Sequence, residues 1–133
     1  MSTNPSPIPM LAAWDVTVAG RPEWVERVNA YTSGQAKARY YADLTDAWPD
    51  IPFTALRCRK AGPPHSSDAF IRNAVYRGQP TLRCGQRVRV GTAVGVVVGH
   101  NDSANFDVLF DADSAKYAGL TLNCHPSDIA LLP

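Results

Sequence analysis

The stretch 88–110, VRVGTAVGVVVGHNDSANFDVLF, restricts the possible fold more than any other part of the chain. At both of its ends, valine or phenylalanine alternates with polar residues, which is the period of a β-strand with one buried face. Gly91-Thr92-Ala93 and the polar segment 100–105 interrupt the alternation with residues that favour turns. The stretch therefore predicts two successive β-hairpins.

The rest of the C-terminal region continues this β pattern. It predicts a turn, a strand, a single 3₁₀ turn and a last short strand, at 111–114, 120–124, 125–128 and 129–132. Short strands spaced by about ten residues indicate a small barrel or sandwich. A 3₁₀ turn before the last strand resembles SH3-like barrels of the KOW and Tudor kind. Gly95 and Gly99 bracket the second strand, where a sharply curved sheet needs a bulge or a kink.

The N-terminal half mixes strand and helix patterns. Residues 14–20 alternate as a strand does, whereas 24–31 fits either a second extended piece or a short turn of helix. Thr32 and Gln35 match a capping box, and the apolar line that follows predicts a helix ended by Pro49. That apolar line consists of Tyr40, Leu44 and Trp48.

Segment 51–60 then predicts a strand, with Arg57 and Arg59 on the face opposite Leu56 and Cys58. A second helix is predicted over 68–77, with Ser66 or Ser67 as its N-cap and Gly78 just beyond its end. We therefore expect an α+β fold with a strand–helix–strand unit, a linking helix and an SH3-like β-barrel. The expected parts are an extended N-terminal arm over 1–13, a small α+β unit over 14–62, a linker and helix over 63–80, and the barrel over 81–133.

Length and composition limit the class of protein. A chain of 133 residues suits one domain or two very small ones, and 45% hydrophobic residues are enough to form a core. No apolar run approaches the roughly 20 residues that cross a bilayer, and the N-terminus lacks the basic and apolar regions of a signal peptide. We expect a cytoplasmic protein. Its three widely spaced cysteines, Cys58, Cys84 and Cys124, argue against a disulfide framework or a zinc ribbon.

Charge is distributed unevenly along the chain. The segments 1–56 and 101–133 are acidic, whereas 57–100 holds a single acidic residue, Asp68. The basic residues of that middle segment are Arg57, Arg59, Lys60, Arg72, Arg77, Arg83, Arg87 and Arg89. Arginine suits bidentate contacts with phosphate or carboxylate, so these eight residues are the predicted partner-binding site.

Segment 83–129 also resembles a module that recurs in small proteins of bacteriophages and prophages. The residues that carry the resemblance are Gly95, Val97, Gly99, Asn101, Ser103, Ala104, Asn105, Phe110, Asp111, His125 and Pro126. No activity follows from the resemblance, but it implies a phage or mobile-element context, and hence the cytoplasm of a host cell or a virion. Small phage accessory proteins often act by binding DNA, a virion component or a host defence protein.

Catalytic and metal sites have little support in the sequence. Cys124 and His125 are adjacent, so in a strand their side chains point to opposite faces, and Cys84 could meet His100 only across strands. The aspartates 107, 111 and 113 lack the glycine and glutamate of an EF-hand loop. We therefore expect neither an enzyme, nor a cofactor, nor a metal site.

The sequence leaves two kinds of partner open. The arginine-rich segment 57–89 favours nucleic acid or a nucleoprotein, provided that its cations lie on a common surface. The alternative is a protein-interaction module, either a virion assembly component or an inhibitor of a host defence protein, in which the same arginines meet an acidic surface. Trp14 and Trp24 either cover the sheet or anchor a protein partner, and the proline-rich arm could dock onto another subunit.

Overall fold

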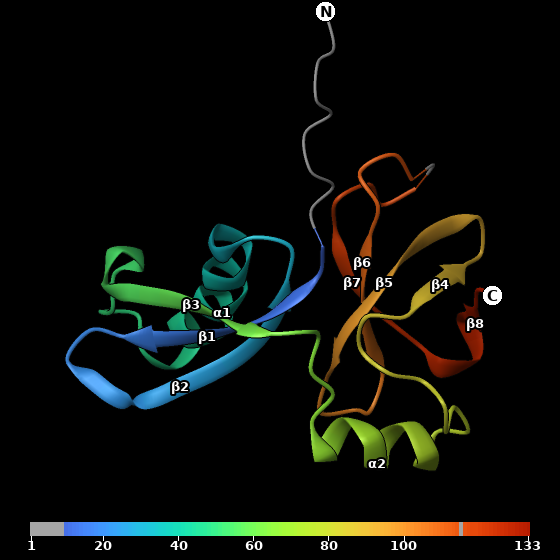
Figure 1. The fold of residues 1–133 in the computed structure, drawn as a ribbon, viewed down its shortest axis with the longest axis horizontal. Coiled ribbons are helices and arrows are strands. Elements are labelled where there is room, and N and C mark those ends of the chain that lie inside the picture. Colours follow the sequence, from blue (N-terminus) through green and yellow to red (C-terminus); the bar gives the residue numbers. More distant parts are fainter. Residues whose placement is uncertain (1–9, 115) are drawn as a thin grey trace, which may run out of the picture. The chain divides into compact units, whose positions relative to one another are not determined.

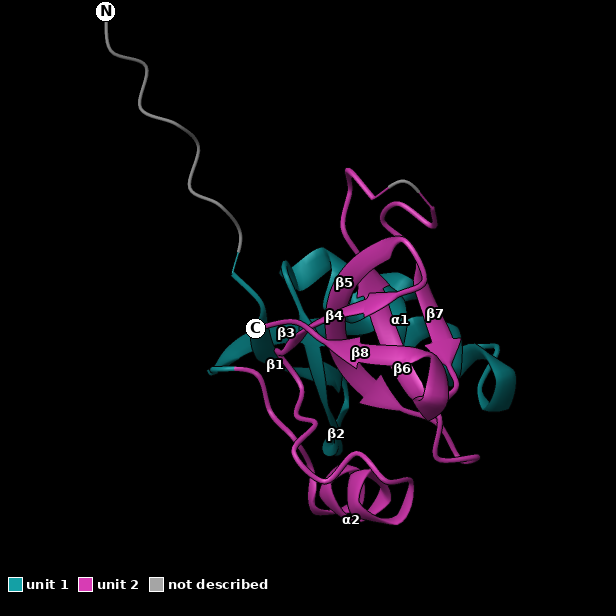
Figure 2. Cartoon of the chain, turned by 90° about the vertical axis from the view of Figure 1, so that its right-hand side faces the viewer, with its two compact units in different colours: residues 1–63 teal, residues 64–133 magenta. Residues whose placement is uncertain are grey.

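The computed structural model describes residues 10–114 and 116–133, and it divides into two compact units, 1–63 and 64–133 (Figures 1 and 2). Each unit contains one antiparallel sheet and one α-helix, so the expected α+β class is confirmed. The predicted arm over 1–13 lies outside the described residues as far as residue 9, and its last two residues, Ala12 and Ala13, already belong to the first strand.

The first unit has a three-stranded sheet in the order β2-β1-β3. The strands are β1 (Ala12–Val18), β2 (Arg21–Ala30) and β3 (Leu56–Gly62), and helix α1 (Ser33–Ala47) lies along one face of the sheet (Figure 1). The ambiguous segment 24–31 is thus almost entirely strand. Its extended form follows from the pairing of six successive residues, 25–30, with β1 across a hairpin that turns at Gly20, where φ is +81°.

Helix α1 begins as its capping residues predict. The Thr32 hydroxyl accepts a hydrogen bond from the Gln35 backbone N–H at 3.1 Å, and the Gln35 side chain accepts one from the Tyr31 N–H at 2.8 Å. The buried side of α1 packs on the sheet through Ala36 and Leu44. The core of this unit consists of Val16, Val18, Val28, Ala30, Ala36, Leu44 and Leu56.

The strand predicted over 51–60 begins later than expected. Residues Phe53–Ala55 form a 3₁₀ turn, η1, closed by the Ala55 N–H donating to the Pro52 carbonyl at 3.0 Å. Only from Leu56 does the backbone pair with β1. Phe53 is therefore not part of a buried strand face and is 39% exposed.

The second unit begins with α2 (Asp68–Tyr76), followed by a five-stranded sheet in the order β7-β6-β5-β4-β8. Its strands are β4 (Arg87–Val90), β5 (Ala93–His100), β6 (Phe106–Phe110), β7 (Thr121–Cys124) and β8 (Ile129–Leu131). The predicted 3₁₀ turn before the last strand is confirmed as η2 (Pro126–Asp128). The closed barrel is not confirmed, because β7 and β8 remain two separate edges of the sheet among the described residues.

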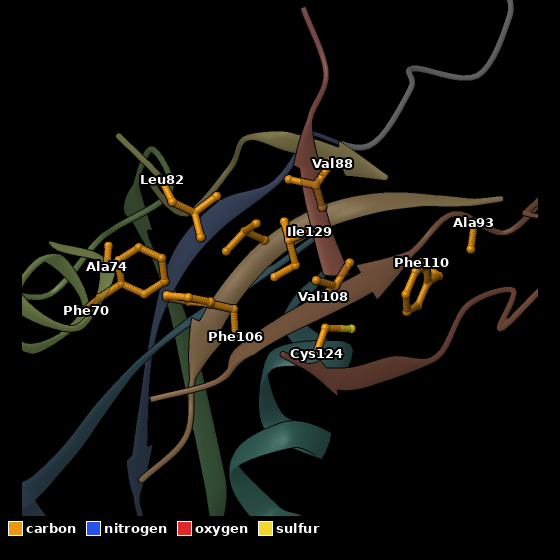
Figure 3. Packing of buried hydrophobic residues seen from close by; sticks show 11 residues of the cluster. Phe70, Ala74, Leu82, Val88, Ala93, Phe106, Val108, Phe110, Cys124 and Ile129 are labelled. Carbon is orange, nitrogen blue, oxygen red and sulfur yellow. The ribbon is translucent and has the colours of Figure 1, made fainter. Parts of the chain in front are cut away.

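One core holds α2 against this sheet (Figure 3). Phe70 and Ala74 of α2, together with Leu82, meet strand residues on one face, and the Phe70 ring contacts the Phe106 ring edge-on at 5.4 Å between centroids. Helix α2 is thus an integral part of the second unit and not a free linker. Gly95 is required by close packing, because a Cβ there would lie 2.5 Å from the Leu109 carbonyl oxygen. A break in register between Val97 and Gly99 supplies the expected bulge.

Among the helices of residues 10–114 and 116–133, none is both long and apolar enough to cross a membrane.

Candidate nucleic-acid interface

The two arginines of β3 share one face of the three-stranded sheet. The register places Arg57 opposite Thr17 and Arg59 opposite Asp15, and both arginines are exposed. Cys58 between them packs against the core on the helix side of the sheet. Lys60 follows the same alternation as Cys58, so it is separated from the two arginines and lies on the opposite face.

A third arginine joins this face from β2. Arg27 pairs with Asp15 in the register, and its Nε lies 2.9 Å from Oδ1 of that carboxylate while its Nη2 lies 3.3 Å from Oδ2. The side chain of Arg27 remains 46% exposed. We call the surface formed by Arg27, Arg57, Arg59, Asp15 and Thr17 the arginine face. The sequence did not single out Arg27, because the strand containing it could not be assigned from its pattern.

The arginine face is the side of the sheet that α1 does not cover. Helix α1 packs on the other side, against Val16, Val28 and Leu56. The face carries three guanidinium groups and one carboxylate, and that carboxylate is shared with Arg27. In the part of the chain that the structure describes, Arg59 forms neither a hydrogen bond nor an ion pair. A surface with this excess of positive charge attracts polyanions.

Two of the predicted site residues, Arg57 and Arg83, make the same local contact in different units. In each, Nη1 donates to the carbonyl oxygens of the residues three and one positions earlier. The distances are 2.8 and 3.0 Å for Arg57, and 3.0 and 2.7 Å for Arg83. These bonds use one nitrogen of the guanidinium, and among the described residues no carboxylate forms an ion pair with either arginine.

The other cations of the second unit differ in whether a carboxylate pairs with them. Arg87 forms a bidentate ion pair with Asp111, in which Nη1 lies 2.7 Å from Oδ1 and Nη2 donates to Oδ2. Arg89, two residues further along β4 and on the same face, is exposed. Arg72 is exposed on α2. Within residues 10–114 and 116–133, neither Arg89 nor Arg72 forms a hydrogen bond or an ion pair.

Arg77 ties together pieces of the second unit that are distant in sequence. Its Nη1 donates to the Ser103 carbonyl at 2.9 Å, and its Nη2 lies 3.0 Å from Nε2 of His125. The turn containing Ser103 is itself held by Asn101, whose Oδ1 accepts from the backbone N–H groups of Ser103 and Asn105 at 3.0 and 3.1 Å. Several of the residues that carry the sequence resemblance to a phage module thus meet around Arg77, which is one of the eight predicted site residues.

A serine–histidine pair, which the sequence reasoning missed, lies at this corner. Nδ1 of His125 is 2.7 Å from the Ser127 hydroxyl and 3.1 Å from the Ser127 N–H. The Ser127 backbone N–H donates to Nδ1, so His125 acts as the N-cap of η2. The histidine and the serine are two residues apart in one 3₁₀ turn, and this local capping contact accounts for their proximity.

The cysteines are poorly placed for nucleophilic chemistry. Burial raises the pKa of the Cys58 thiol against the opposing charge of Lys37, and burial together with nearby carboxylates raises the pKa of the Cys124 thiol. A thiol with a raised pKa carries little thiolate near neutral pH, and the thiolate is the reactive form. The described residues contain no cluster of three histidine, cysteine, aspartate or glutamate side chains that could hold a metal ion.

The first unit also has an exposed aromatic cluster. The rings of Trp24 and Trp48 lie 5.1 Å apart between centroids, and the guanidinium carbon of Arg21 lies 4.5 Å from the Trp24 centroid and 5.9 Å from that of Trp48. Trp48 is 48% exposed, although the helix pattern assigned it to the core. We call these three residues the tryptophan cluster. Trp14 and Trp24 both pack against the core, and Trp14 donates its indole N–H to the Ala30 carbonyl at 3.0 Å.

No protein family, curated protein or solved structure matches this chain at a significant level. The assignment of a function therefore depends on the geometry of the two units.

Proposed function

We propose that the protein is a non-enzymatic, phage-type accessory protein that binds nucleic acid or a nucleoprotein, with the arginine face as a principal contact surface. The observation that carries the proposal is the excess of positive charge on a flat sheet face that the helix of its own unit leaves uncovered. Arg57 and Arg59 project from one strand, and Arg27 projects from another. Exposed guanidinium groups bind phosphate oxygens and displace counterions, which is the main source of affinity for nucleic acids.

In this proposal the second unit is an SH3-like small barrel that acts as a scaffold and adds further cations. The support is its strand order, in which the last strand pairs with the first strand of a four-stranded meander, and the 3₁₀ turn η2 that comes just before the last strand. Arg72 and Arg89 contribute charge in this unit, since both are exposed. The phage-type origin rests on the sequence resemblance of segment 83–129.

The proposal can be tested with one pair of variants on β3. Arg59→Gln removes a cation from the arginine face, whereas Lys60→Gln removes one from the opposite face of the same strand. Fluorescence anisotropy with a labelled duplex and a labelled single strand, at several salt concentrations, gives the affinity and its salt slope. We expect Arg59→Gln to reduce the slope by about 0.9 per lost phosphate contact, and Lys60→Gln to change it little.

Equal effects of the two substitutions would contradict a role for the arginine face. A lack of binding to any DNA or RNA by the wild-type protein at micromolar concentration and low salt would remove the proposal altogether.

The tryptophan cluster favours a second candidate, a protein-interaction module of a virion or an inhibitor of a host defence protein. Tryptophan and arginine are the residues most enriched at the energetic centres of protein interfaces. Trp48 is half exposed and lies beside Arg21. Capture of a single virion or host protein by the wild-type chain, lost in Trp48→Ala and retained in Arg59→Gln, would favour this candidate over nucleic-acid binding.

A further inference from the structure

We propose that one face of α2, formed by Arg72, Val75 and Tyr76, binds an unpaired nucleobase together with its phosphate, which makes single-stranded nucleic acid the preferred partner. We call this surface the α2 outer face. The inference rests on the proposed function and narrows it, because a stacking site distinguishes single strands from a duplex.

Two apolar side chains of the α2 outer face, Val75 and Tyr76, are exposed next to each other. Tyr76 is 82% exposed and Val75 is 59% exposed, whereas Phe70 and Ala74 on the inner side of the helix are buried. A single exposed apolar residue is ordinary on a protein surface. Here, however, an aromatic ring and a neighbouring valine lie beside an arginine one helical turn earlier, since positions 72 and 76 share one side of the helix.

Both functional groups of this face are available. In the described part of the chain, Tyr76 takes part in no ring contact and no hydrogen bond, and Arg72 forms no ion pair. Asp68 lies one turn before Arg72 and is the only acidic residue of the helix. It does not reach Arg72 within ion-pair distance, so the guanidinium retains donors for a ligand.

The end of α2 that bears Tyr76 is firmly anchored. The helix ends where Gly78 takes φ of +78°. The Gln79 side chain then donates to the carbonyls of Pro126 and Ile129 at 2.9 and 3.2 Å. Arg77 adds its contacts with Ser103 and His125. The backbone that carries the ring is thus fixed, so binding orders the side-chain torsions of Tyr76 and not the helix end as well.

The chemistry of the α2 outer face selects the occupant. An aromatic ring stacks on any nucleobase, because every base has a flat π surface, and an adjacent arginine holds the phosphate. The bases of a duplex are already stacked on one another and cannot cover the Tyr76 ring. Segment 64–100 of the second unit holds five arginines (72, 77, 83, 87 and 89) and one acidic residue, Asp68, which favours a polyanionic partner over a neutral protein surface.

The experiment uses the full chain and fluorescence anisotropy with labelled 20-nucleotide single strands of DNA and RNA, a 20-base-pair duplex, and poly-glutamate as a competitor. Tyr76→Ala removes the ring and Tyr76→Phe keeps it. Tyr117→Ala is the matched control, because Tyr117 is also a tyrosine of the second unit, 45% exposed, but follows the acidic turn at 111–113 and packs on Phe110. Far-UV circular dichroism establishes that each variant is folded.

We expect Tyr76→Ala to weaken binding to single strands by about 5- to 100-fold, the range measured for the loss of one base–aromatic stack. Tyr76→Phe should retain affinity within about twofold, because the ring alone stacks. The duplex affinity should change by less than about twofold, since its bases are not accessible. Tyr117→Ala should leave both affinities unchanged.

If the wild-type protein binds single strands, three results would overturn the inference. They are an unchanged affinity of Tyr76→Ala for single strands, an equal loss for single strands and duplex, and poly-glutamate competing as well as DNA with the same dependence on Tyr76, which indicates an acidic protein partner. Binding of the duplex without binding of single strands also overturns it while leaving the proposed function intact. Binding of neither removes both.

Discussion

The same three-residue pattern, arginine–apolar–arginine, occurs on one strand of each unit with different results. Arg57-Cys58-Arg59 lies on β3 and Arg87-Val88-Arg89 on β4, and in both the middle residue turns toward the core of its own unit. Register alone suggests that Arg59 is the neutralised one, since it lies directly opposite Asp15. In fact Asp15 pairs with Arg27, and it is Arg87 that is neutralised, by an aspartate outside its register.

The difference shows that a sequence pattern determines which face a charge occupies, but not whether that charge remains free. Alternation along a strand is a local property. Neutralisation depends on a carboxylate brought in by another part of the chain: Asp111 follows β6, 24 residues after Arg87. The excess charge of segment 57–100 therefore overstates what a partner can use, because Arg87 is compensated within its own unit.

The largest effects should come from the two separate cores. Phe70→Ala should destabilise the second unit by about 3–5 kcal/mol, and Leu44→Ala the first by about 2–5 kcal/mol, because each leaves a cavity. All three tryptophans lie in the first unit. Tryptophan fluorescence during urea unfolding should therefore shift for Leu44→Ala and hardly shift for Phe70→Ala, whereas far-UV circular dichroism should report both. A fluorescence transition displaced equally by both substitutions would show that the units unfold together.

An intermediate effect is expected from releasing Arg87. Asp111→Asn removes the carboxylate that pairs with Arg87, so that β4, like β3, carries two arginines without that ion pair. The salt slope of nucleic-acid binding should then rise by up to about 0.9. The loss of an exposed ion pair should lower stability by only about 0.2–1 kcal/mol. Asp113→Asn, in the same turn but without an ion pair among the described residues, is the control. A weaker affinity in Asp111→Asn than in the control would contradict the comparison.

The sequence predicted those features of the fold that depend on neighbouring residues. The capping residues Thr32 and Ser67 set the starts of the two helices, and the valine alternation set β4 to β6. Neighbouring residues could not show whether the sheet closes into a barrel, because closure requires its two edge strands to pair with each other. The candidate site was predicted only in part for the same reason. Lys60 lies on the face of the sheet opposite the arginine face, and Arg27 could be assigned to the arginine face only from the pairing of β2 with β1.

The smallest effect concerns Glu26, an exposed residue that lies opposite Val16 on the helix side of β2, where its carboxyl is only partly desolvated. Burial raises the pKa of this carboxyl above its ordinary value of 4.5, and the negative charge of Asp43 adds to the rise. The contribution of this group to stability is therefore complete below pH 4.5 and is lost as the pH rises through the raised pKa.

Glu26→Gln removes the cost of burying the ionised carboxylate and should stabilise the first unit at pH 7 by less than about 1 kcal/mol, since the side chain is partly solvated. The gain should disappear in acid, where the wild-type carboxyl is protonated as well. Urea unfolding followed by tryptophan fluorescence at pH 7 and in acid measures it, with Glu23→Gln, at an exposed position of the same strand, as the control. A loss of stability at pH 7 would mean that the ionised carboxylate makes a favourable contact that outweighs its burial.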